Sequence, residues 1–232
     1  MSKQKAGRVG FVAASVFCLL SLALPYGYGK EIDRWLQDNG GEWYVQPGTL
    51  SAEGQQNPLA YALYRNRFLA DTGIETSSDA EQTGKQLLEK TEALAEAGAL
   101  SQQAAKQARA ILAKQGAQTS SKIENGFVSA TYWVADEEDG TSEVVRASWQ
   151  EKTGLVTFYS VSTDKETANP AEGMEAYKKY LGVDTLTDWT RSSGTEQSQY
   201  SWSQAGQLYL FCQWENGRTT LGVSSRELEA AP

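Results

Sequence analysis

The hydrophobic pattern of this chain changes its period near residue 122. Before that point, apolar residues recur every three or four positions, as they do along one face of a helix. From Ile123 onward, aromatic and β-branched residues replace alanine and alternate with polar residues, which is typical of strands. A chain with both patterns must pack helices against a sheet, and we therefore predict an α+β fold.

The helical part, residues 30–121, begins with a neck that contains several glycine and proline turns. Asn57 is a suitable N-cap, and Pro58 fits the first turn of a helix that continues towards Gly73. We expect the neck and this first helix to lead into a helical hairpin.

The hairpin is the clearest local prediction. Ser78 and Glu81 have the spacing of a capping box, and an apolar stripe follows them, which predicts a helix over residues 79–97. Ser101 can cap a second helix with a matching stripe, which ends near Gly116. Short connections of this kind join antiparallel helices.

The second part, residues 122–228, predicts an antiparallel sheet of about seven strands with one helix packed on it. Turn dipeptides such as Asp139-Gly140 separate the alternating segments. A helix that begins at Pro170 and ends at Gly182 divides the strands into a group of three and a group of four. The expected strands are 127–134, 142–149, 155–161, 185–190, 199–203, 208–214 and 219–224. We find no internal repeat in the sequence.

The N-terminus has the features of a signal-anchor segment, residues 1–29. Three basic residues precede an uncharged apolar run that extends over residues 9–28, about the length needed to cross a bilayer. The basic flank predicts a cytoplasmic N-terminus, a single membrane pass and a C-terminal domain outside the cytoplasmic membrane. Gly27-Tyr28-Gly29 also resembles a cleavage site, and cleavage there would make the protein secreted.

Charge and cysteine content restrict the partners and the chemistry of the exported part. The formal net charge of the chain is −8, and the basic residues before the apolar run are included in that value. Such an acidic surface repels nucleic acid and anionic lipids, so we expect no nucleic-acid partner. Cys212 is the only cysteine beyond the apolar run, and its position inside an alternating strand indicates an inert core residue.

The sequence contains no positive sign of catalysis. It has no histidine, which excludes imidazole bases and histidine metal ligands, and it has no phosphate-binding glycine motif. The acidic run Asp136–Asp139 precedes Gly140, but its spacing does not match a calcium loop, so we interpret it as a solvated hairpin turn. We therefore expect no catalytic residue, no metal ligand and no cofactor.

The sheet region contains more aromatic residues than a small core commonly uses. We predict a ligand or partner surface that uses Trp133, Tyr159, Trp202 and Trp214. Alternation places neighbours such as Tyr132 and Trp133 on opposite faces of the sheet, so both faces carry large side chains. The helix after Asn169 can cover one face. For the other face, we expect the N-terminal hairpin as the cover, with a bound protein or a stacked glycan as alternatives.

The segment Val144–Trp189 resembles small PepSY-like and regulatory accessory domains that Gram-positive bacteria place outside the membrane. The resemblance rests on a strand pair around Lys152-Thr153-Gly154 and on a helix that ends in Tyr180-Leu181-Gly182-Val183. It implies an inhibitor or a sensor, and it supplies no catalytic residue.

Together these features predict a membrane-tethered, extracytoplasmic, non-catalytic domain that binds another envelope protein in a regulatory or structural role. The alternative is a cell-wall glycan-binding module that stacks sugars on exposed aromatic rings.

Overall fold

A computed structural model describes residues 50–66, 74–76, 80–115, 117–135, 142–163, 169–192, 197–215 and 217–225. All of them belong to one compact unit, Leu50–Pro232. The expected anchor at residues 9–28 and the acidic run Asp136–Asp139 lie outside the described residues. None of the helices in the described ranges is long and apolar enough to cross a membrane.

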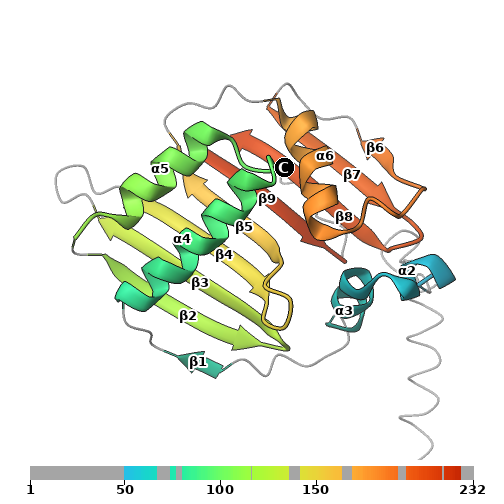
Figure 1. The fold of residues 1–232 in the computed structure, drawn as a ribbon, viewed down its shortest axis with the longest axis horizontal. Helices are drawn as coiled ribbons and strands as arrows, with labels where there is room; N and C mark the ends of the chain where they lie inside the picture. Colours follow the sequence, from blue (N-terminus) through green and yellow to red (C-terminus); the bar gives the residue numbers. More distant parts are fainter. Residues whose placement is uncertain are drawn as a thin grey trace, which may run out of the picture. The chain divides into compact units, whose positions relative to one another are not determined.

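The centre of the unit is a nine-stranded antiparallel sheet with the order β1-β2-β3-β4-β5-β9-β8-β7-β6 (Figure 1). The strands are β1 (Ile74–Thr76), β2 (Gln118–Glu124), β3 (Phe127–Ala135), β4 (Ser142–Gln150), β5 (Val156–Ser162), β6 (Thr190–Ser192), β7 (Ser198–Ser203), β8 (Leu208–Glu215) and β9 (Arg218–Ser224).

Two meanders make up this sheet. The strands β2 to β5 follow one another in space, and so do β6 to β9. The two meanders meet through their last strands, because β5 pairs antiparallel with β9 from Phe158–Gly222 to Ser162–Arg218. From the join outward, the strands of each meander thus follow in reverse sequence order, although the sequence shows no repeat.

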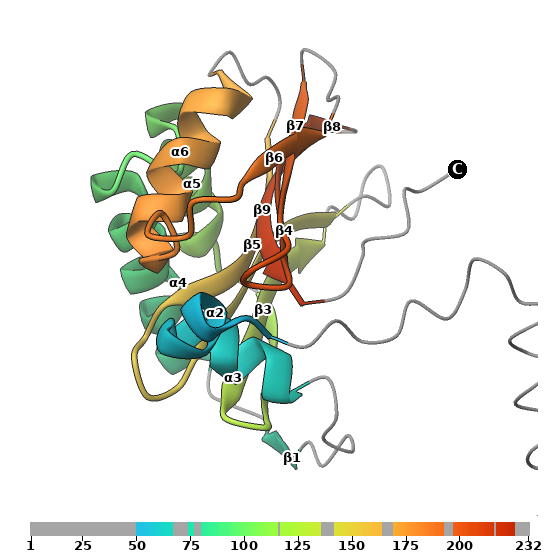
Figure 2. The same cartoon turned by 90° about the vertical axis from the view of Figure 1, so that its right-hand side faces the viewer.

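Five helices accompany the sheet in the described part of the chain. They are α2 (Ala52–Gln56), α3 (Pro58–Asn66), α4 (Ala80–Glu96), α5 (Gln102–Leu112) and α6 (Pro170–Leu181). Figure 2 shows α4, α5 and α6 on the same side of the sheet. The first two contact strands of the first meander, and α6 contacts β7 and β8 of the second. Each meander is therefore preceded in sequence by the helices that cover it.

The predicted caps at Asn57, Ser101 and Gly182 explain where three helices begin or end, whereas Ser78 lies outside the described residues. The side chains of Ser101 and Asn169 accept hydrogen bonds from backbone N–H groups in the first turns of α5 and α6. Gly182 ends α6 in the left-handed conformation, with φ of 66°, which glycine adopts without strain. At α3, the Asn57 side chain accepts from the Ala60 N–H at 3.0 Å. These boundaries were predictable because each depends on one local hydrogen bond.

One core fills the space between the helices and the sheet. It includes Leu87 and Leu94 of α4, Ile111 of α5 and Met174 of α6. From the sheet, Val145 and Leu221 join the same cluster across both meanders. The hairpin and the sheet thus share one hydrophobic core.

The structure confirms the α+β class and corrects its details. The expected boundary between residues 121 and 122 falls inside β2, which we had not predicted, so it does not separate two folded units. The strand expected at 185–190 is displaced to β6, Thr190–Ser192, and β1 adds a further strand. In the described part of the chain, three helices pack on the sheet instead of the expected one. Segments such as β2 were missed because their polar residues contribute little to the hydrophobic alternation.

The expected cover of the second sheet face is also corrected. The hairpin α4–α5 does not lie opposite α6 but beside it, on the same face (Figures 1 and 2). The reason is topological: both meanders belong to one continuous sheet, and each packs its own preceding helices on the same side. No described helix covers the opposite face, which we call the open face.

Candidate functional site

The strand register defines which side chains lie on the open face. Residues paired across the sheet share a face, and residues next to one another in a strand alternate. Gly173 of α6 approaches Cys212, so the residues of β8 on either side of Cys212 point the other way. Tracing these pairs through the sheet assigns these aromatic residues to the open face: Phe127, Trp133, Phe158, Tyr200, Trp202, Tyr209 and Phe211.

An aromatic row crosses the join between the two meanders. In register, Phe158 of β5 is followed by Gly222 of β9, Phe211 of β8 and Tyr200 of β7. The rings of Phe158 and Phe211 lie 6.4 Å apart between centroids, at 52°. They come together above Gly222, where a Cβ atom would lie only 2.2 Å from the Phe211 ring. Tyr200 extends the row and donates a hydrogen bond to the Gln213 side chain at 3.1 Å.

Two further aromatic groups flank this row. Trp202 stacks on Tyr209 with a centroid distance of 3.8 Å and an interplanar angle of 30°. In the first meander, Trp133 of β3 faces Val144 of β4 in register. Both tryptophans are half-buried, which leaves part of each ring accessible.

A polar row runs parallel to the aromatic row. In register across seven strands, it consists of Ser120, Thr131, Arg146, Ser160, Thr220, Gln213 and Ser198. The hydroxyls of Ser160 and Thr220 are hydrogen-bonded at 3.2 Å. Arg146 is exposed and lies near the middle, with its guanidinium carbon 5.6 Å from the centroid of the Phe158 ring. Phe211, Thr220 and Ser198 are buried, so the accessible part of the open face combines half-buried rings and hydroxyls with one exposed central arginine.

The charge of the open face differs from that of the chain. Among the described residues that alternation places there, the cations are Lys122, Arg146 and Arg218, and the anions are Glu75, Glu124 and Glu215. Lys122 and Glu124 form an ion pair at 2.9 Å. By contrast, α4 alone carries four glutamates. The excess negative charge of the protein is therefore not on the open face.

The four aromatic residues predicted as a site do not form one surface. Trp133 and Trp202 are on the open face. Tyr159 is fully buried on the helix side, where its hydroxyl lies 2.8 Å from that of Thr91, so its assignment to a surface is wrong. Trp214 is half-buried, and alternation from Cys212 places it on the helix side of β8. Trp149, another aromatic residue of the sheet, is buried beneath Lys90.

The prediction of opposite faces for Tyr132 and Trp133 is confirmed by the register, and the same alternation separates Phe158 from Tyr159. Periodicity therefore separated the residues into two sets correctly. It did not show which set the helices cover, and Phe158, Tyr200 and Phe211 were not selected as site residues for that reason.

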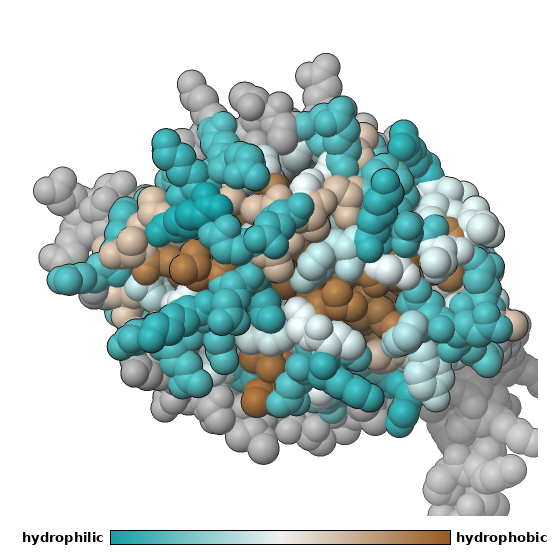
Figure 3. Space-filling model, viewed as in Figure 1, coloured by the Kyte–Doolittle hydropathy of each residue, from teal (hydrophilic) through white to brown (hydrophobic). Residues whose placement is uncertain are grey.

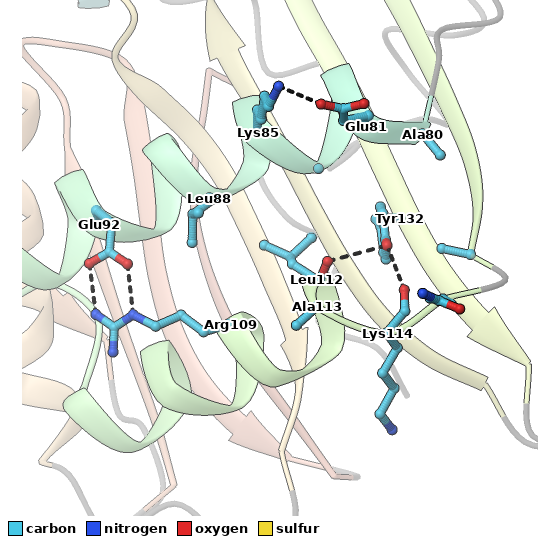
Figure 4. Close-up of a pocket in the computed structure, with 13 residues that line it drawn as sticks. Ala80, Glu81, Lys85, Leu88, Glu92, Arg109, Leu112, Ala113, Lys114 and Tyr132 are labelled. Carbon is cyan, nitrogen blue, oxygen red and sulfur yellow. Dashed lines mark hydrogen bonds and ion pairs between the residues drawn. The ribbon is translucent and has the colours of Figure 1, made fainter.

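On the helix side, a groove of about 680 Å³ runs between α4 and α5. Figure 3 shows this side as mostly hydrophilic, with some hydrophobic side chains exposed between the charged ones. Leu88 and Leu112 contribute to the apolar lining, and Tyr132 of β3 also lines the groove (Figure 4). The Tyr132 hydroxyl donates a hydrogen bond of 3.0 Å to the backbone carbonyl of Lys114, just after the end of α5, and this carbonyl thus has a partner.

The charged groups around the groove are already paired. Arg109 donates two hydrogen bonds of 2.7 Å to Glu92, and this hydrogen bonding lowers the pKa of the Glu92 carboxyl (Figure 4). Lys85 pairs with Glu81 at 2.6 Å, and Lys114 pairs with Glu143. Of these pairs, Arg109–Glu92 joins α5 to α4 and so supports the hairpin.

Metal binding and thiol chemistry have no site in the described part of the chain. No cluster of three or more acidic or cysteine side chains suited to a metal ion occurs there. Cys212 is fully buried as a free thiol, and burial raises its pKa to about 12. This placement confirms Cys212 as a core residue, and the thiolate needed by a nucleophile is suppressed.

Comparisons with protein-family models, with curated proteins and with solved structures give no match for this chain. The geometry of the open face and of the groove is therefore the basis for a proposed function.

Proposed function

We propose that this protein is a non-catalytic binding protein that holds another protein of the cell envelope on the open face of its sheet. In this proposal, residues 9–28 keep the chain at the cytoplasmic membrane, and the folded unit lies outside. The role is regulatory or structural, as the resemblance to accessory domains implies.

One observation carries the proposal: the open face has the side-chain composition of a protein-binding surface. Tyrosine, tryptophan and arginine dominate binding energies at interfaces, whereas lysine, aspartate and glutamate are depleted there. Antibody paratopes combine rigid aromatic rings with serine hydroxyls in a similar way. The aromatic and polar rows place these side-chain types next to one another.

A sugar-binding surface would require a different arrangement of rings. Sugar stacking uses a flat aromatic face, and the contact between Trp202 and Tyr209, 3.8 Å between centroids, leaves only one face of each ring for it. Phe158 and Phe211 meet at 52° and offer no common plane. These contacts favour a protein partner over a glycan.

The experiment is site-specific photocrosslinking in intact cells that produce the full-length chain. A photoreactive residue at Thr131, on the open face, should form a discrete protein adduct. The same residue at the exposed Lys106, on α5, should not. If adducts form only from position 106, the helix side is the binding surface and the proposal fails.

Replacement of rings then tests the aromatic contribution. Trp133→Ala and Trp202→Ala should each weaken the adduct-forming interaction by about 2 kcal/mol or more, the loss expected at an interface anchor. Tyr61→Ala is the matched control, because Tyr61 of α3 is 45% exposed and is not on the open face. If neither tryptophan variant changes the yield of the adduct, the partner does not bind on the open face.

A further inference from the structure

Arg146 lies near the centre of the open face and has no carboxylate partner among the described residues. Its guanidinium is held over the Phe158 ring at 5.6 Å, which orients it by a cation–π contact. The other cations of the open face each have an acidic neighbour. Lys122 forms an ion pair with Glu124, and Arg218 is in register with Glu215 at the β8–β9 turn. Arg146 is thus exposed and oriented, and no carboxylate of the described residues pairs with it.

The side chains around Arg146 complement an anionic group. In register, Thr131 of β3 and Ser160 of β5 lie on either side of it, and both carry hydroxyls that can donate hydrogen bonds. A planar guanidinium with hydroxyls beside it fits one carboxylate, which it can bind through two parallel hydrogen bonds. The aromatic row next to it would exclude water and strengthen this contact.

Resting on the function proposed above, we propose that Arg146 binds an aspartate or glutamate side chain of the partner, and that apolar residues beside that acid pack on Phe158 and its neighbours. The partner surface is thus acidic at one point and apolar around it. A phosphate or an anionic lipid headgroup would call for several cations together, whereas Arg146 is a single, central one.

Charge complementarity supports this assignment. The excess negative charge of the protein repels acidic partners over most of its surface. In register, three cations (Lys122, Arg146 and Arg218) and three anions (Glu75, Glu124 and Glu215) belong to the open face, so it lacks the negative excess of the chain, and Arg146 lies near its middle. An acidic partner would therefore be steered to this face and placed in one register.

The test uses short random peptides displayed on phage and selected on the full-length protein in detergent. Selected peptides should contain an aspartate or glutamate beside aromatic or aliphatic residues, and Trp133→Ala should reduce their binding. Replacing that acid by its amide should weaken binding about tenfold to a hundredfold to the wild type, the range expected for a charge-assisted hydrogen bond. The same replacement should have little effect on binding to Arg146→Gln.

Lys106→Gln is the matched control, because it removes one exposed positive charge from α5 and should keep the full preference for the acid. Thermal unfolding should show that Arg146→Gln remains folded, since an exposed side chain contributes little to stability. Added salt should weaken acidic peptides on the wild type more than on Arg146→Gln.

The outcomes separate the two proposals. Peptides that need Trp133 but show no preference for an acid would overturn the role of Arg146 and leave the binding face intact. Peptides that are insensitive to every open-face variant would overturn the binding face itself. Polygalacturonate is tested in parallel, and if it binds through Arg146 while peptides do not, the carboxylate belongs to a glycan and the protein partner is rejected.

Discussion

At the scale of single residues, the environment of each side chain decides its chemistry. Cys212 and Tyr159 have reactive groups, but both are fully buried, and burial raises the pKa of each. Arg146 is exposed and has no carboxylate partner in the described part of the chain. Exposure, more than residue type, therefore distinguishes the structural groups from the candidate binding group.

Cys212 should make stability depend on pH in the alkaline range. Its pKa is raised from 9.0 to about 12 in the folded protein, so the folded state holds the proton more tightly than the unfolded state. The resulting stability is complete below pH 9 and is lost as the pH rises from about 9 towards about 12, at no more than about 1.4 kcal/mol per pH unit. Urea unfolding at several pH values measures the slope.

Cys212→Ser provides the control, because serine does not titrate in this range. Buried tyrosines such as Tyr177 also have raised pKa values and destabilise both proteins at high pH, so the difference between the two slopes measures the thiol together with its effect on Tyr177. Native Cys212 should also react slowly with thiol reagents, in a chain whose other cysteine, Cys18, is replaced. Equal slopes or rapid labelling would show that the thiol is accessible.

At the scale of elements, glycine in a strand allows the two halves of the aromatic row to meet. Gly222 of β9 stands between Phe158 of β5 and Phe211 of β8, and the two rings occupy the space that a side chain would fill. Glycine destabilises a strand, so we explain Gly222 by the close approach of the two rings above its Cα atom. The strand pair β8–β9 thus shapes the open face as well as the core.

Gly222→Ala should therefore displace the Phe211 ring, because the new methyl carbon would lie 2.2 Å from it. We expect a loss of about 1–3 kcal/mol in the free energy of unfolding, the usual cost of overpacking, and weaker partner binding. Thermal or urea unfolding measures the loss.

Gly84→Ala is the contrasting variant. Its methyl group would meet Tyr132 at an ordinary contact distance of 3.4 Å inside α4, and alanine favours a helix, so stability should be unchanged or rise by up to about 1 kcal/mol. If both variants behaved alike, the contact of Phe211 with Gly222 would not be the controlling feature.

At the scale of the whole molecule, the join between β5 and β9 makes one sheet and one core out of two meanders. The helices of both halves lie on one face, so the other face extends without interruption across the join (Figure 2). A binding surface that spans both halves depends on this join, and the halves should unfold together.

Tyr159→Phe tests this cooperativity. It removes the hydroxyl that lies 2.8 Å from Thr91, while Thr91 keeps its hydrogen bond to the Leu87 carbonyl, so the loss should be about 1 kcal/mol. The slowest-exchanging amides of β3 and of β8 should both report the same decrease in the free energy of unfolding, although Tyr159 lies in the first meander. Protection that falls in β3 and stays constant in β8 would mean that the meanders open separately.

Much of the local structure was predictable because it depends on neighbouring residues. Ser101, Asn169 and Gly182 define helix boundaries through single local hydrogen bonds or one backbone conformation. Alternation located β3, β4 and β8 to within one residue at each end. It failed for β2, whose polar residues pair with β3 and alternate little in hydrophobicity.

The candidate site was predictable only in part. Trp133 and Trp202 were chosen because the sheet holds more rings than a core needs, and both are on the open face. Tyr159 was chosen by the same argument but is buried. An excess of aromatic residues in the sequence does not indicate which of them the helices cover. Arg146 gave no signal in the sequence, since one arginine in an alternating strand is an ordinary solvated residue.

By itself, the sequence determined the α+β class, most helix and strand boundaries, and the division of strand residues into two alternating sets. These properties follow from periods and caps that act over a few residues. Only the tertiary structure decided that β5 pairs with β9, that the hairpin and α6 share one face, and that Arg146 lies near the centre of the other. Contacts between residues 60 positions apart are selected by the packing of the whole core, which no local pattern specifies.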